Sequence, residues 1–410
     1  MKQILYKVIN KDAYLQINYR IIIPVIFLLV ISLVLLRSTS ADMLSGNSTF
    51  SRQLIWILIG FLAFIIIQYI NVNLYNEYAY HAYILLILLL FTTYFMPIVG
   101  GARRWLVLGP ISFQPSEIGK LVMVFSLSRY LCDQNIKKYP IKSIISSIIL
   151  TIIPTVLVFR QPDLGTSIIY VTIIFPMLYW SGIKSYYIFL FLAPIISIIA
   201  AFNLMLFYLW MAILILVLFY NQPKLFHGAL NFTLNVLCGL LAPIIWHDIL
   251  YDHQRSRVEV FLNPLSDPHG SGYQIIQSLT AIGSGGLWGK GFNQGTQTQL
   301  KFLPVRDTDF IISVLGEEYG FFGISFLLVT FMFMIYWILN YCEKISNQFL
   351  ALTLIGLSTI LFSHMIINMG MTVGLFPVTG LPAPFISYGG TFLLTCLMIV
   401  GLINSIISQR

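Results

Sequence analysis

Twelve apolar runs separated by polar loops constrain the fold of this 410-residue chain more than any other feature. Most runs are about 17 to 20 residues long, enough for an α-helix to cross a hydrocarbon core of about 30 Å. Lipid offers the backbone no hydrogen-bond partners, so such runs must be helical, and the sequence has no alternating barrel-type strands. The runs cover residues 21–36, 54–70, 81–98, 115–131, 143–159, 165–181, 185–202, 204–220, 228–247, 309–337, 350–368 and 387–407.

Composition supports a lipid-facing surface. Only 9% of the residues are charged and 58% are hydrophobic, whereas a soluble domain has roughly 25% charged residues. The first run follows a basic tail and has no small-residue cleavage site behind it, so we expect it to be retained as a span. We therefore predict an all-α, polytopic transmembrane protein with about 10–12 spans, in which residues 1–410 form a single membrane domain.

Basic residues in the short loops predict the orientation. If the N-terminus is cytoplasmic, the inner segments carry twelve Lys and Arg residues and the short outer loops carry five. This excess favours both termini inside and places the long loop, about 248–308, outside. The formal net charge of +8 is spread over these many loops, which argues against nucleic-acid binding.

Four charged or Gly- and Pro-rich segments lie at predicted membrane boundaries, where each costs free energy unless it is paired or solvated. All four fall on the predicted outer side, which suggests one polar site that opens outward. The first contains Arg103 and Arg104, then Glu117 and Lys120, whose i, i+3 spacing allows an ion pair. It could anchor the chain at headgroup level, or it could bind a phosphate through the arginine fork.

The second segment is a tight turn between two spans, and the third is the long loop. In 160–167, Asp163 could cap the following helix, pair with an arginine of the site, or do both. The long loop contains Asp267-Pro-His-Gly-Ser-Gly-Tyr and then Gln274. Asp before Pro often only starts a turn, but nearby glycines permit close approach to a ligand. Long loops are usually functional or disordered, and this one is too rich in Gly, aromatic and apolar residues for disorder.

The fourth segment, 375–390, holds three prolines and a Gly pair at membrane depth. These residues break a helix, so we expect the backbone there to line an enclosed or wet cavity. Glu317 and Glu318 lie in the span 309–337, which follows the long loop, and unpaired carboxylates in a span are costly. The sequence contains no P-loop, dinucleotide fingerprint, nucleophile elbow or metal-ligand spacing.

Six segments, in the same order, resemble the signature segments of the SEDS family, which comprises RodA, FtsW and SpoVE. They are GARRWLVLGPISFQPSEIGK (101–120), RQPDLGTS (160–167), DPHGSGYQIIQSLTAIGSGGLWGKG (267–291), FLP…TDF (302–310), GEE (316–318) and PVTGLPAPFISYGG (377–390). The resemblance covers roughly residues 20–410. GSGG at 283–286 and GTQTQLKFLP at 295–304 look more like the elongation member than the division member.

The resemblance implies a peptidoglycan glycosyltransferase of the bacterial inner (cytoplasmic) membrane that polymerises lipid II during cell elongation. It implies a class B penicillin-binding protein and the elongation machinery as partners. It also implies Asp267 as the essential acidic residue, which we assign as general base for the acceptor hydroxyl. The implied substrate-binding residues, together with our own candidates, are Arg103, Arg104, Glu117, Lys120, Asp163 and Gln274. A divalent cation such as Mg²⁺ or Mn²⁺ could help to balance the pyrophosphate charge.

Two departures from the family pattern matter. Val305 and Asp307 stand where the family commonly has Glu and His, so no role is carried over to either position. About two additional spans are expected between 183 and 246, an even number that preserves topology. A lipid II flippase stays an alternative, since transporters also have broken helices and charges at membrane depth. Because the unusual residues cluster on one face, the sequence favours the enzyme over the flippase. A mere scaffold would leave the buried charges unexplained.

Overall fold

The computed structural model describes most of the chain. The described residues are 17–40, 48–98, 101–108, 111–136, 138–222, 225–244, 246, 248, 255, 259–261, 263–268, 270 and 272–408. Predictions that involve the remaining positions, including His269 and Ser271 of the long loop, lie outside the described residues.

Within these described ranges, each of the twelve predicted runs forms a helix. They are α2 (Tyr19–Thr39), α3 (Thr49–Gln68), α5 (Ala79–Thr92) continued by η1 (Thr93–Phe95), α6 (Pro115–Asp133), α7 (Pro140–Phe159), α8 (Leu164–Trp180), α9 (Ser185–Ala200), α10 (Leu204–Asn221), α11 (Leu225–Ile244), α15 (Ile311–Cys342), α16 (Gln348–Thr372) and α17 (Gly390–Ser408). Eight are long and apolar enough to cross a membrane, and α5 with η1, α8 and α9 are shorter apolar helices. The remaining helix, α6, contains four charged residues, which lower its hydropathy. The prediction of an all-α, multi-pass membrane protein is confirmed.

Short elements lie between the long helices. They are α4 (Asn73–Glu77), β1 (Leu106–Leu108), β2 (Ile111–Phe113), η3 (Pro264–Ser266), α13 (Tyr273–Gly285) and α14 (Thr296–Gln299). The two strands pair antiparallel, with Leu106 opposite Phe113. The long loop is therefore partly helical where it is described.

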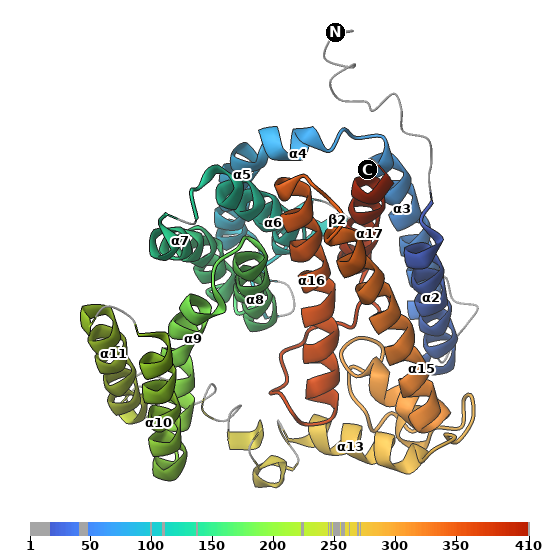
Figure 1. Ribbon diagram of the computed structural model, residues 1–410. Helices are drawn as coiled ribbons and strands as arrows, with labels where there is room; N and C mark the ends of the chain where they lie inside the picture. The colour runs from blue at the N-terminus through green and yellow to red at the C-terminus, as the bar shows by residue number, and fades with distance from the viewer. Residues whose placement is uncertain are drawn as a thin grey trace, which may run out of the picture.

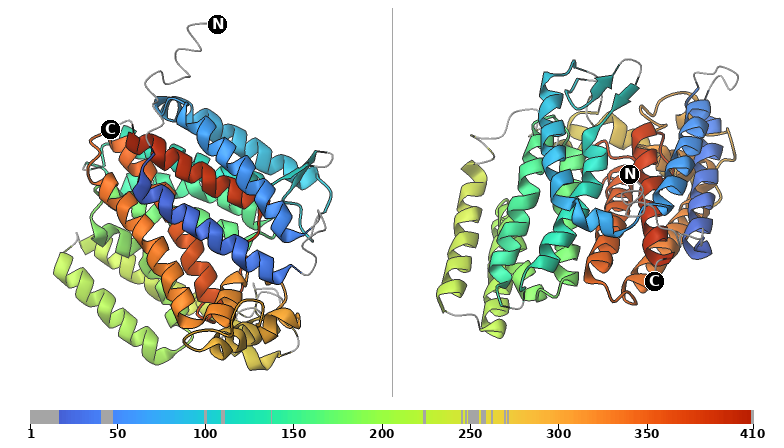
Figure 2. Two further views of the ribbon diagram at one scale, coloured as in Figure 1. Left: turned by 90° about the vertical axis from the view of Figure 1, so that its right-hand side faces the viewer. Right: turned by 90° about the horizontal axis from the view of Figure 1, so that it is seen from above.

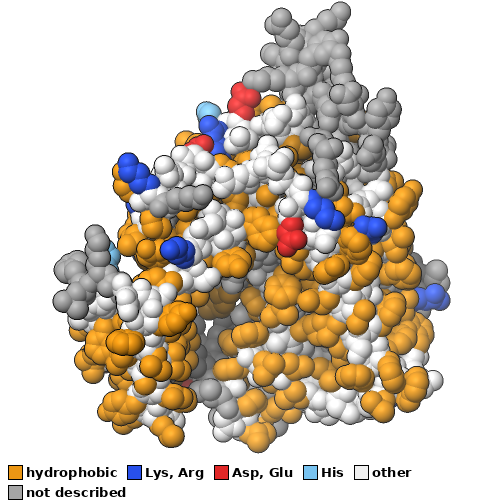
Figure 3. Space-filling view, viewed as in Figure 1, with side chains coloured by type: hydrophobic (Ala, Val, Ile, Leu, Met, Phe, Trp, Pro, Cys, Tyr) orange, Lys and Arg blue, Asp and Glu red, His pale blue; other side chains and the backbone are white. Residues whose placement is uncertain are grey.

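The helices alternate in direction, so that connections gather at two ends. The start of α2 and the end of α17 lie at one end, and α13 lies at the other (Figure 1). The β1–β2 hairpin also lies at the end away from the C-terminus of α17 (Figure 2). On the face drawn in Figure 3, hydrophobic side chains cover the flanks, and most Lys and Arg gather toward the end at which α17 finishes. The four unusual segments thus share one end of the bundle, opposite the more basic end.

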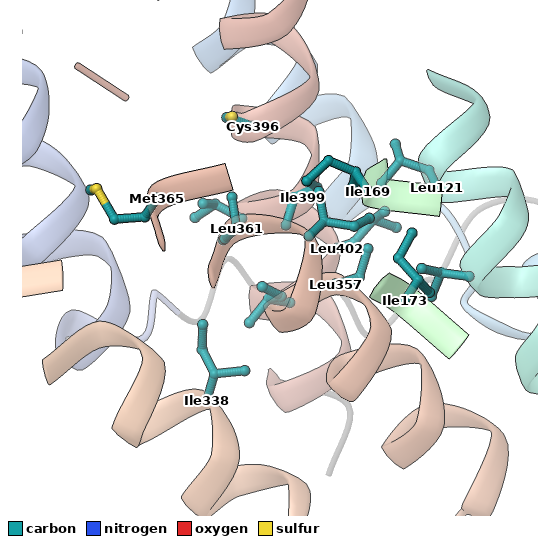
Figure 4. Packing of buried hydrophobic residues seen from close by; sticks show 14 of the residues in the cluster. Leu121, Ile169, Ile173, Ile338, Leu357, Leu361, Met365, Cys396, Ile399 and Leu402 are labelled. Atoms are coloured by element: carbon teal, nitrogen blue, oxygen red, sulfur yellow. The ribbon is translucent and has the colours of Figure 1, made fainter. Parts of the chain in front are cut away.

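The core is organised around α16, most of whose side chains are buried. Its Leu357, Leu361 and Met365 pack among residues such as Ile169 of α8 and Ile399 of α17 (Figure 4). The helix contacts α6, α8, α15 and α17. In lipid such close packing is itself a main force holding helices together. The buried polar residues of α16, among them His364 and Asn368, therefore face protein, which matters for the site below.

Helices α9, α10 and α11 form a separate group at the edge of the molecule (Figure 1). Their interior has a small apolar cluster of its own and a polar link. Ser197 donates to Asn235 Oδ1 at 2.6 Å, and Trp210 Nε1 donates to Ser197 Oγ at 2.8 Å. The region 185–244, expected to contain additional spans, thus forms three helices joined by buried hydrogen bonds.

Candidate active site

A cavity of about 640 Å³ lies at the end of the bundle that carries the four unusual segments. Three of those segments form its wall, together with the turn before α15. The lining residues include Arg104, Gln114, Glu117, Asp163, Asp309, Thr379, Gly380, Pro382, Tyr388 and Phe392. Polar side chains and exposed backbone therefore surround a space large enough for a diphosphate with part of a sugar.

The broken segment 377–390 forms one wall, as its prolines predicted. It is held by side chains from the neighbouring elements rather than by helical hydrogen bonds. Asn368 of α16 donates to the Leu381 carbonyl at 2.6 Å and to the Asp309 carbonyl at 2.9 Å. Ser387 Oγ donates to the Thr308 carbonyl at 2.5 Å. The segment is thus fixed both to α16 and to the turn before α15.

Glu117 and Lys120 form the ion pair that their spacing predicted. Pro115 starts α6, which places both side chains on its first turns. Lys120 Nζ lies 2.8 Å from Glu117 Oε2, and the Lys120 side chain is fully buried. Lys120 Nζ also lies 3.0 Å from Nε2 of His364, on α16. A lysine charge at membrane depth is therefore stabilised by one carboxylate and one imidazole beside the cavity.

The two adjacent arginines have different surroundings. Arg104 lines the cavity, and its buried Nε has no hydrogen-bond partner. Asp309 lines the same cavity. Arg103 instead is exposed and donates to the carbonyl of Tyr94 at 3.2 Å, which ties the hairpin to η1. Of the two predicted cationic ligands, Arg104 lines the cavity and Arg103 does not.

Asp163 performs the capping role that the sequence suggested. Its carboxylate accepts a hydrogen bond from the backbone N–H of Thr166 at 3.1 Å, at the start of α8. It also accepts one from Gln114 Nε2 at 2.7 Å. Among the described residues, Asp163 forms no ion pair with an arginine. Asp163 still lines the cavity, so the fold brings it together with Arg104 and Glu117.

Asp267 and Gln274 lie outside this cavity lining. Asp267 follows η3, and its Oδ1 accepts the backbone N–H of Gly270 at 2.9 Å. A Cβ on Gly270 would come within 3 Å of the Asp267 carboxylate, so a larger residue there would force that carboxylate to move. Gln274 is half-buried on the first turn of α13. The turn-forming interpretation of Asp267 is thus correct, and the structure does not bring its carboxylate onto the wall formed by Arg104.

Helix α13 nevertheless connects the Asp267 turn to the cavity wall. Ser278 Oγ donates to the Thr372 carbonyl at 2.6 Å, at the end of α16, and lies 2.7 Å from Ser313 Oγ on α15. Thr372 is the last residue of α16, the helix that leads into the broken segment. Displacement of the turn is therefore resisted by hydrogen bonds to the two helices that flank the cavity wall.

Sequence reasoning missed two buried residues near the cavity, His364 and Asn368, and the half-buried Asp309 that lines it. A signal was present for the first two, since ionisable and amide side chains inside an apolar run are costly and face protein. Asp309 lies at the start of a predicted span, within a segment that was quoted for the family resemblance but given no role. In all three cases the sequence did not indicate which distant groups these side chains would contact.

Known proteins resemble this chain over almost its whole length. The family model described as "Cell cycle protein", which covers FtsW, RodA and SpoVE, matches residues 15–212 and 207–410. Peptidoglycan glycosyltransferase MrdB of Escherichia coli (strain K12) is 34% identical over 390 residues, covering 94% of each chain. Peptidoglycan glycosyltransferase RodA of Treponema pallidum is 28% identical and covers 88% of this chain and 89% of its own.

Solved structures have the same fold. A chain of a peptidoglycan synthase complex matches with a TM-score of 0.72 at 25% identity, covering 97% of this chain and 99% of its own. The rod shape determining protein RodA of Thermus thermophilus matches with a TM-score of 0.62 at 22% identity, covering 97% and 98%. Sequence and fold agree along the whole chain: this protein belongs to the FtsW/RodA/SpoVE family.

Proposed function

We propose that this protein is a peptidoglycan glycosyltransferase that polymerises lipid II at the outer face of the bacterial cytoplasmic membrane during cell elongation. The observation that carries the proposal is the polar cavity at one end of a lipid-embedded helix bundle. It offers an arginine with a buried, unpartnered Nε and a buried lysine–carboxylate pair. Relatives named peptidoglycan glycosyltransferase align over almost the whole chain.

The leaving group of this reaction is a polyprenyl pyrophosphate, which keeps the electron pair of the C1–O bond of the donor sugar as that bond breaks and the new glycosidic bond to the acceptor oxygen forms. Arg104 lines the cavity and Lys120 lies beside it, so both can stabilise that charge in surroundings where water is scarce. Because the polyprenyl chain stays in lipid, a cavity at the end of a membrane bundle lets the diphosphate bind while the chain remains solvated. We assign Arg104 and Lys120 to the pyrophosphate.

The acceptor sugar hydroxyl must lose a proton as it attacks. We assign Asp267 as the general base, a contribution of roughly 10²–10⁴-fold. Its turn lies at the same end of the bundle, and α13 ties it to the cavity wall. The acceptor would bind between the turn and the cavity, so Asp267 contacts the acceptor and Arg104 the donor. A divalent cation on the diphosphate stays a prediction, which the effect of a chelator on turnover tests.

A glycan polymerase of this kind also needs a partner that crosslinks its product. One structural relative is part of a peptidoglycan synthase complex, in which polymerisation and crosslinking are coordinated. We propose a class B penicillin-binding protein as the partner of this chain, because newly made glycan strands need transpeptidation close to the site where they emerge.

The test is glycan synthesis from lipid II by the purified protein in detergent or nanodiscs, with and without its penicillin-binding partner. Polymer should form, and Asp267→Asn should fold normally and reduce turnover by at least about 10²-fold. Near-normal polymer from Asp267→Asn would remove it as the base. Transport of fluorescent lipid II across proteoliposomes without polymer formation would instead support the flippase.

A further inference from the structure

His364 is a fully buried side chain near the cavity that the proposed chemistry does not use. It lies on α16, inside an apolar span. An imidazole there is costly unless both ring nitrogens have partners. Both do: Nε2 lies 3.0 Å from Lys120 Nζ, and Nδ1 lies 3.3 Å from the carbonyl oxygen of Pro382.

These two partners determine the tautomer. An ammonium group can only donate and a carbonyl oxygen can only accept. Nε2 of His364 must therefore be the acceptor for Lys120, and Nδ1 must carry the hydrogen that points to Pro382. The ring of Phe392 packs on the imidazole, with centroids 4.6 Å apart, and restricts its rotation. The imidazole is neutral and held in one orientation.

The arrangement determines where the Lys120 charge lies. Of its three N–H donors, the described residues engage two, through Glu117 at 2.8 Å and His364 at 3.0 Å. Glu117 lines the cavity, and Lys120 is fully buried directly behind it, so the ammonium charge acts on an anion in the cavity electrostatically, across the cavity wall. A neutral acceptor holds the ammonium in place without cancelling its charge, which a second carboxylate would do.

We propose that His364 is a positioning residue for the donor substrate. By accepting from Lys120 and donating to Pro382, it fixes the ammonium relative to the broken segment that walls the cavity. Three elements meet at this ring: α6 through Lys120, α17 through Phe392, and the segment 377–390 through Pro382. The inference rests on the proposed pyrophosphate role of Lys120. It identifies His364 as the residue that holds the Lys120 ammonium in position for that role.

The first experiment compares two substitutions by steady-state kinetics with lipid II. His364→Phe keeps a ring against Phe392 but deletes both hydrogen bonds, and it should reduce kcat by roughly 10-fold or more. His364→Gln supplies one acceptor and one donor and should stay within about 3-fold of the native kcat. Equal loss in both variants would overturn the proposal.

A matched control breaks another hydrogen bond between the same two helices. Thr353 of α16 donates to Ser128 of α6 at 3.2 Å, away from the cavity lining. Thr353→Val should leave kcat within about 2-fold. If His364→Phe does not fold, His364→Asn replaces it: its shorter amide cannot reach both partners, so it should lose activity where Gln does not.

The second experiment is a double-mutant cycle on the affinity for a polyprenyl pyrophosphate. This affinity can be measured for inactive variants as well. His364→Phe should weaken binding by roughly 10-fold in the native background and by less than about 2-fold in Lys120→Met. Full weakening in both backgrounds would show that His364 does not act through Lys120. If Lys120→Met alone changes neither binding nor turnover, the assigned pyrophosphate role of Lys120 fails instead.

Discussion

Two buried carboxylates with lysine partners lie at the same end of this bundle, yet they have different roles. Glu117 is on the first turn of α6 and pairs with Lys120 at 2.8 Å. Glu317 is near the start of α15 and pairs with Lys290 at 2.9 Å. Sequence alone gives both the same description: a carboxylate entering an apolar helix.

The surroundings of Glu317 saturate it with the chain's own donors. Besides Lys290, its oxygens accept from the backbone N–H of Gln297 at 2.9 Å and of Thr298 at 3.0 Å. The hydroxyls of Thr296 and Thr298 donate as well. Every donor comes from residues 290–298, so Glu317 fastens the long loop to α15.

Glu117, by contrast, faces the 640 Å³ cavity, and Lys120 is its recorded hydrogen-bond partner among the described residues. Both carboxylates carry the cost of burial, but the fold compensates Glu317 fully and leaves Glu117 with capacity for a ligand. A buried charge indicates function only when the protein itself does not satisfy it.

The largest expected effect concerns the orientation on which both regions depend. In a background without the four native cysteines, Ser266→Cys should react with an impermeant maleimide added to intact spheroplasts. Ser346→Cys, at the opposite end, should react only after lysis. The reason is the excess of basic residues at the inner end. Labelling of Ser346→Cys alone would invert the topology and place both carboxylates on the cytoplasmic side.

Next in size is the loss of the saturated carboxylate. Glu317→Ala leaves Lys290 and several N–H and O–H donors without their acceptor, and it should destabilise the protein by about 3–5 kcal/mol. The folded fraction should keep its specific activity. Thermal unfolding and turnover per folded molecule measure the two separately, with Glu117→Gln as the contrasting variant. A turnover defect in Glu317→Ala equal to that of Glu117→Gln would erase the distinction between the two regions.

The cavity side is tested by a matched pair of neighbours. Arg104→Ala removes a cavity-lining donor and should weaken lipid II binding by about 1.5–3 kcal/mol, or roughly 10- to 100-fold. Arg103→Ala removes only an exposed contact to Tyr94 and should change affinity by less than about 3-fold. Binding isotherms in nanodiscs give both values. Equal losses would mean that general basicity, rather than placement in the cavity, governs affinity.

The smallest effect should come from Lys290. Lys290→Met removes one partly exposed donor from Glu317 and leaves the backbone and threonine donors in place. We expect a stability loss of about 1 kcal/mol or less and normal turnover. Lys120→Met, the equivalent change on the cavity side, should instead reduce turnover and substrate affinity. Comparable kinetic defects in the two lysine variants would contradict their separate roles.

Much of the fold was predictable because it depends on local pattern. Each apolar run forms a helix, since lipid permits no other spanning conformation for such a segment. Alternating helix direction then places the four unusual segments at one end. The Glu117–Lys120 pair and the Asp163 cap were predictable for the same reason: both partners lie within a few residues of each other.

Only the tertiary structure decided which of these residues share a site. Arg103 and Arg104 are neighbours in sequence, but backbone direction in the turn before β1 sends one to the surface and the other to the cavity. His364 reaches Lys120 across 244 residues. Asp267 folds onto its own turn, apart from the cavity lining. Sequence determined that this chain spans the membrane and where its costly polar residues lie, because helical period and hydrophobicity are local. Which partners satisfy those residues depends on how distant helices pack.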